Sequence, residues 1–102
     1  MRIYKYHLSI GHLVESVISV PSGSKLLDIG IQKGMGHYHA WFEVNPELPK
    51  MDFSIYCIYT GSEFNSIGLQ YVKTVIESDT FVAHFYIKRD MVEFLAKDEM
   101  SL

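Results

Sequence analysis

Two histidines separated by one residue, His37 and His39, are the clearest candidates in the sequence for metal binding or other side-chain chemistry. Alternate residues of a β-strand point to the same face, so a strand here would place both imidazoles together. Such a pair can supply two ligands to zinc or nickel. Glu43 shares that face but lies about 13 Å from His39 at roughly 3.3 Å per residue, so a neighbouring strand would have to complete a site. We therefore expect no bound metal and no cofactor.

Trp41 belongs to the same row as the two histidines. A large aromatic side chain on a polar strand face is typical of a surface that binds a partner, although a C-terminal helix could equally cover it. A second apolar candidate is Phe64, which lies beside Glu63 in the irregular segment 61–68, because long loops often carry function. The predicted binding residues are Trp41, Phe64, His37, His39 and Glu63.

No residue pattern indicates catalysis. His84 has no nucleophile elbow around any candidate serine, and general-base chemistry would need a nearby nucleophile or carboxylate in a cleft. Cys57 lies within the apolar run 53–59, which predicts a buried, slowly reacting thiol. The glycines at 34 and 36 precede a strand pattern rather than a helix, which favours a hairpin turn over a phosphate loop. We expect a protein that is not an enzyme.

The elements that must position these residues are strands, because apolar residues recur with period two. Seven strands are predicted at 2–8, 13–20, 25–32, 37–44, 52–60, 69–77 and 81–88. The fourth has the inward row Tyr38, Ala40, Phe42 and Val44 and the outward row His37, His39, Trp41 and Glu43. In the strand at 13–20 the inward row is Val14, Ser16, Ile18 and Val20. In the strand at 25–32 it is Leu27, Ile29 and Ile31. The fifth strand is apolar on both faces, which predicts a central position.

A helical pattern follows the strands. Residues 89–100 have apolar side chains at helical spacing, with Asp90 as the predicted N-cap and Glu93 completing a capping box. The sequence thus predicts one domain, 1–102, with a β core at 2–88 and a short helix at 89–100. The fold class is mainly β: an antiparallel sandwich or small open barrel of about seven strands, or a flat sheet with the helix on one face.

Composition excludes several partners. Twelve acidic residues stand against nine Lys and Arg, scattered along the 102 residues, for a net charge of -3. Duplex nucleic acid needs a clustered basic face, so we expect no such partner. The seven tyrosines could stack single-stranded bases, but without a basic groove cross-strand packing is the better account. No apolar run reaches the length of a membrane span, and the single cysteine agrees with an intracellular compartment.

An ordered series of short motifs resembles an uncharacterised family of small proteins from tailed bacteriophages and prophages. The motifs are the opening Arg2-Ile3-Tyr4-Lys5-Tyr6, Pro21 and Gly23, Leu27, Gln32 and Gly34, Trp41 before Val44-Asn45-Pro46, residues 53–61, Tyr71-Val72 and Phe81-Val82-Ala83-His84. The chain departs from that family at Asn45, Ser62 and Ala83, where aspartate, histidine and tryptophan are common. The resemblance implies a phage gene product that acts in the cytoplasm of the infected bacterial host, and it implies no activity.

These observations favour a non-enzymatic interaction protein that binds a host or phage protein during infection. The alternatives are a module that sequesters a small molecule or nucleotide, and a minor virion component. Unpaired edges of a small sheet also favour a homodimer.

Overall fold

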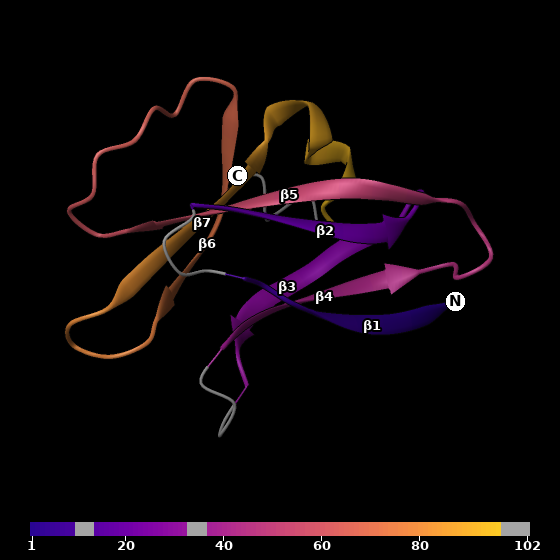
Figure 1. The fold of residues 1–102 in the computed structure, drawn as a ribbon, viewed down its shortest axis with the longest axis horizontal. Helices are drawn as coiled ribbons and strands as arrows, with labels where there is room; N and C mark the ends of the chain where they lie inside the picture. Colours follow the sequence, from indigo (N-terminus) through magenta and orange to yellow (C-terminus); the bar gives the residue numbers. More distant parts are fainter. Residues whose placement is uncertain (10–13, 33–36, 97–102) are drawn as a thin grey trace.

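Two antiparallel β-sheets face each other in this protein, as the computed structural model in Figure 1 shows for residues 1–9, 14–32 and 37–96. Sheet A has the order β1 (Arg2–His7), β4 (Tyr38–Val44), β3 (Lys25–Ile31). Sheet B has the order β2 (Glu15–Pro21), β5 (Lys50–Tyr59), β7 (Val82–Lys88), β6 (Leu69–Ile76). The predicted mainly β class is confirmed: these residues form an open two-sheet sandwich, not a closed barrel or a single flat sheet. The predicted turn at 33–36 lies outside the described residues.

Side-chain alternation builds the core between the sheets. The predicted inward row of β4 is buried throughout, as is Phe53 on the facing sheet. Aromatic rings join the two layers: the centroids of Phe42 and Phe53 lie 5.2 Å apart, as do those of Tyr38 and Phe85. Edge-to-face pairs of this kind add to the free energy gained by burial. Strand β5 lies between β2 and β7, which confirms its predicted central position.

The predicted inward rows of β2 and β3 were partly wrong. Strand β2 begins at Glu15, so Val14 precedes it and is half exposed, whereas Ser16, Ile18 and Val20 are buried as predicted. In β3 the pairing with β4 shifts between Leu26 and Asp28, and this bulge reverses the alternation. Because a bulge adds one residue to a strand, Leu26 replaces Leu27 in the core, next to Ile29.

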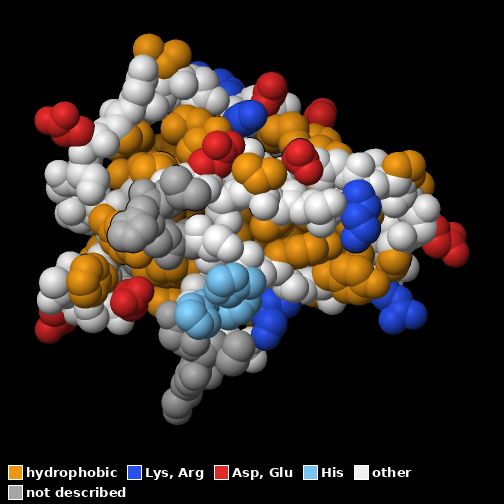
Figure 2. Space-filling view, in the orientation of Figure 1, with side chains coloured by type: hydrophobic (Ala, Val, Ile, Leu, Met, Phe, Trp, Pro, Cys, Tyr) orange, Lys and Arg blue, Asp and Glu red, His pale blue; other side chains and the backbone are white. Residues whose placement is uncertain are grey.

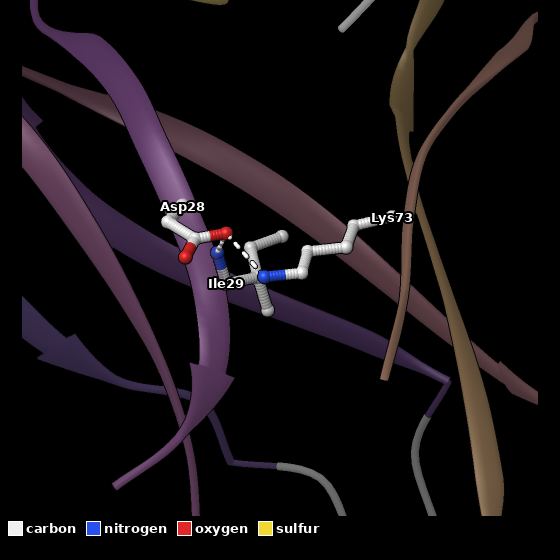
Figure 3. A network of polar contacts seen from close by, with 3 residues as sticks. All are labelled: Asp28, Ile29 and Lys73. Atoms are coloured by element: carbon white, nitrogen blue, oxygen red, sulfur yellow. Dashed lines mark hydrogen bonds and ion pairs between the residues drawn. The ribbon is translucent and has the colours of Figure 1, made fainter. Parts of the chain in front are cut away.

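An ion pair joins the two sheets at one edge of the sandwich. Lys73 of β6 donates to Asp28 of β3 across 2.6 Å, and the same carboxylate oxygen accepts the backbone N–H of Ile29 (Figure 3). Both charged side chains are partly exposed, so the pair contributes at most about 1 kcal/mol. The ion pair connects the bulged segment of β3 to β6 of the other sheet.

The C-terminal helix is shorter and tighter than predicted. It is a 3-10 helix, η1 (Arg89–Phe94), that follows β7 directly, with the extended Lys88 as N-cap and no side-chain cap bond. Asp90 already lies inside the helix, so the predicted N-cap and capping box were wrong. The helix ends because Leu95 turns extended and bridges Leu26 in parallel, while the N–H of Ala96 donates to Leu26. Residues 97–102 lie outside the described part. No helix within that part is long and apolar enough to cross a membrane.

Candidate functional site

Three histidines meet on the outer face of sheet A, where the sequence had indicated two. His7 of β1 lies directly opposite His39 of β4, with ring centroids 5.7 Å apart, and its ring is 5.0 Å from that of His37. Figure 2 shows pale-blue histidine side chains gathered beside basic ones on the lower sheet of that view. We call His7, His37, His39, Lys5 and Trp41 the histidine surface; it is one continuous feature drawn from two adjacent strands.

His39 lies in the predicted outward row, but other side chains cover it. Its side chain is only 3% exposed although it points to the outer face of the sheet. The cover comes from Lys5 of β1, whose ammonium group donates to Gln32, just beyond β3, across 2.6 Å. Since Lys5 lies opposite Trp41, and Gln32 follows the residue opposite Tyr38, this hydrogen bond runs diagonally over β4. The hydrogen-bonded side chains of Lys5 and Gln32 therefore cross over His39.

Burial makes His39 a weak base. Loss of solvent contact lowers its pKa first, and the charges of Lys5, His7 and His37 lower it further, while an interaction with the backbone of His37 opposes them. Its Nδ1 atom is buried and has no hydrogen-bond partner. The lowered pKa favours the neutral imidazole, and one of its ring nitrogens has no hydrogen-bond partner. The neighbouring side chains can carry positive charge.

The three rings do not form a ready metal site. Within residues 1–9, 14–32 and 37–96, no three His, Cys, Asp or Glu side chains are placed so that they could hold a metal ion. Sequence reasoning overlooked His7, although it lies on the row of Ile3 and Lys5 in the first strand. The missing information was the pairing of β1 with β4, which brings His7 and His39 together.

Trp41 lies half buried at one end of this surface, opposite Lys5. Its ring extends over β3, where a Cβ on Gly30 would lie 3.9 Å from Cζ3, and its centroid is 6.1 Å from that of His39. The C-terminal 3-10 helix packs on β6 and β7 of the other sheet, and its Phe94 ring contacts the ring of Phe53. Trp41 therefore retains an open face toward solvent. Glu43, on the same row, is exposed.

Phe64 belongs to a different surface. Its ring lies 5.2 Å from that of Tyr86, which in turn lies 5.7 Å from Tyr71, all over the outer face of sheet B. Phe64 keeps 44% of its surface exposed, and the neighbouring Glu63 is exposed as well. The predicted binding residues thus fall on opposite sides of the sandwich: His37, His39 and Trp41 on sheet A, Glu63 and Phe64 over sheet B.

His84 is occupied by local hydrogen bonds. Its Nε2 lies 2.7 Å from the hydroxyl of Thr60 and its Nδ1 lies 2.9 Å from that of Thr74, which also contacts the Tyr71 hydroxyl at 2.7 Å. Cys57 is buried, as predicted, and burial, followed by the charge of Glu77, raises the pKa of its thiol to about 11. Neither side chain is arranged to attack a substrate, because the ring nitrogens are engaged and the thiol is protonated at neutral pH.

Two hollows lie away from the histidine surface. One of about 290 Å³ is lined by Val17, Asp52, Ser54, Lys88, Asp90 and Met91. An open one of about 670 Å³ is lined by Met1, Arg2, Asn45, Pro46 and Glu47. Small-molecule sites are usually apolar clefts with a few polar groups, and neither hollow has that character.

Comparison with known proteins identifies a family without adding a function. No curated protein and no solved structure matches the chain. A family model described as "Domain of unknown function (DUF7352)" matches residues 1–93, which takes in all seven strands and most of the 3-10 helix. The match covers most of the chain, and the protein therefore belongs to the DUF7352 family.

Proposed function

We propose that this chain is a non-enzymatic interaction protein of bacteriophage origin that binds a host or phage protein during infection, in the cytoplasm of the infected bacterium. The binding site is the histidine surface of sheet A. The observation that carries this proposal is Trp41, a half-buried indole on the central strand of sheet A, among mostly polar side chains of the outer face. The sequence resemblance to small proteins of tailed phages supports the phage origin.

The arrangement around Trp41 suits a protein partner. Tryptophan is enriched among the residues that dominate binding energy, and such residues lie near the centre of an interface with polar groups around them. Here Lys5 lies directly opposite Trp41, and the ring of His39 is 6.1 Å from the indole. The exposed His7 and His37 lie beyond His39. The strands beneath are rigid and hydrogen-bonded, so binding need not order a loop, which limits its entropic cost.

The test is affinity capture of tagged protein from infected cells, followed by calorimetry with the purified partner. The Trp41→Ala variant should bind that partner at least about 30-fold more weakly, which corresponds to about 2 kcal/mol for a central aromatic residue. Phe64→Ala is the matched control, since it removes a half-exposed aromatic ring from the opposite face. Its affinity should equal that of the unmodified protein.

Two outcomes would contradict the proposal. Normal binding by Trp41→Ala together with weak binding by Phe64→Ala would place the interface over sheet B. Recovery of the protein in purified virus particles, without a soluble complex, would instead favour a virion component. Circular dichroism of both variants establishes that each retains the β fold before affinities are compared.

A further inference from the structure

Strand β1 is held in the fold almost entirely by pairing on one side. It occupies the edge of sheet A, and five of its six residues are exposed. The other edge strands bury more: β2 buries four of its seven residues, and β6 has six of eight buried or half buried. Figure 1 shows β4 on one side of β1 within sheet A and no strand on the other. Among the described strands, none pairs with the free side of β1.

The backbone groups on that free side can be identified from the register. The N–H of Leu8 donates to the carbonyl of Tyr38 at 3.0 Å, so Leu8 and Tyr38 form a hydrogen-bonded pair. Such pairs alternate along an antiparallel ladder. Arg2, Tyr4 and Tyr6 therefore direct their N–H and C=O groups toward β4, and the intervening residues direct theirs outward. Unpaired groups of this kind are a template for another strand.

We propose that β1 pairs antiparallel with β1 of a second copy of this chain, about a two-fold axis at Tyr4, so that two sheets A become one six-stranded sheet. Residues directly opposite in a ladder lie on the same face, which restricts the axis to a residue position. An axis at Lys5 would place two lysines directly opposite, a destabilising pair of like charges. An axis at Ile3 would pair only Arg2, Ile3 and Tyr4 within β1.

The axis at Tyr4 uses residues 1–7 and pairs compatible side chains. Tyr4, which is 36% exposed, lies opposite Tyr4 of the second copy. Arg2 lies opposite Tyr6 of the second copy, where a guanidinium group can lie over an aromatic ring. Ile3, 65% exposed, lies opposite Lys5 of the second copy. The outward N–H and C=O groups of Ile3 and Lys5 then bond to those of Lys5 and Ile3 across the axis.

This interface uses backbone groups of β1, including those of Lys5, and leaves the side chains of Trp41 and the histidines on the outer face. The faces of the two sheets continue across the axis, so the dimer presents two copies of Trp41 on one broad surface. The self-association does not depend on the proposed function, and the assays below need no partner protein.

Variants with one added cysteine test the register directly. Cys57 is buried, so cysteines placed at Ile3, Tyr4 and Lys5 would be the reactive thiols. In a non-hydrogen-bonded pair the Cβ atoms approach within about 4.5–5.5 Å, close enough for a disulfide after slight adjustment. Mild oxidation should covalently dimerise Tyr4→Cys and leave Ile3→Cys and Lys5→Cys monomeric on a non-reducing gel. Selective cross-linking at position 3 or 5, equal cross-linking at all three, or none would overturn the proposal.

A proline provides the second test. Lys5→Pro removes an N–H group that β4 does not use, and proline is tolerated on edge strands where that group faces solvent. Light scattering at tens of micromolar should give twice 11.8 kDa for the unmodified protein and for Lys5→Ala, but a single chain for Lys5→Pro. Circular dichroism verifies that the β fold persists in each. A monomeric unmodified protein, or a dimeric Lys5→Pro, would refute pairing through β1.

Discussion

Because His39 is buried and its pKa is lowered, we predict that the protein becomes less stable to unfolding as the pH falls. Burial holds the pKa of His39 below the ordinary value of about 6.5 that the histidine would have in the unfolded chain. Below about pH 6.5 the unfolded chain therefore binds a proton at His39 that the folded protein does not bind. The free energy of unfolding falls as the pH decreases. The loss begins near pH 6.5 and stops once the pH is below the pKa of the folded protein, where both states are protonated.

The magnitude is bounded by the number of protons involved. One proton bound only by the unfolded state gives a slope of at most about 1.4 kcal/mol per pH unit. His39 lies beneath side chains on the outer face rather than between the sheets, so the slope should be lower than this limit. Even part of it is measurable in a small domain whose total stability is on the order of 5–15 kcal/mol.

The assay is urea denaturation at pH 7.5, 6.5 and 5.5 at one fixed protein concentration. The unmodified protein should lose stability across this range, and His39→Leu, which cannot titrate and leaves no unpaired ring nitrogen, should lose less. His37→Gln is the matched control, because it removes an exposed histidine from the same surface and leaves His39 covered. Parallel pH dependences for the unmodified protein and His39→Leu would refute the argument that His39 is held neutral.

Three further predictions concern the core and the sheet edge. Tyr6→Phe should be neutral or stabilise by up to about 1 kcal/mol in urea, because the Tyr6 hydroxyl is buried without a partner; a clear loss would reveal one. A double-mutant cycle with Asp28→Asn and Lys73→Met should give a coupling of about 0.2–1 kcal/mol that weakens with salt, and a salt-independent value would argue against an ion pair. Cys57 should react with a thiol reagent much more slowly in native protein than in denaturant, and equal rates would contradict its burial.

The strands and their faces were largely predictable, because period-two alternation is a local property. Tyr38, Ala40, Phe42 and Val44 recur at every second residue, and each is buried. Alternation fails where two similar residues compete: Leu26 and Leu27 are equally apolar, so nothing in the sequence marks the bulge that selects Leu26 for the core.

The candidate site was only half predictable for a related reason. His37, His39 and Trp41 share one strand, so their spacing reveals their common side. His7 and Lys5 arrive from a strand about 30 residues earlier, and only the pairing of β1 with β4 brings them there. The hydrogen bond of Lys5 to Gln32, which crosses β4 near His39, joins residues far apart in the sequence and leaves no local pattern.

The bridge between Leu26 and Leu95 has a consequence for biosynthesis. It connects residues 69 positions apart in the sequence (95 − 26), and Leu95, with its side chain 7% exposed, is part of the core. A ribosome adds about 5–20 residues per second, so β3 emerges several seconds before the segment that bonds to its free edge. During that interval the carbonyl of Leu26 lacks the N–H group of Ala96. The nascent chain must therefore complete its fold after most of it has been translated, and a premature stop before Leu95 would leave that strand edge open to aggregation.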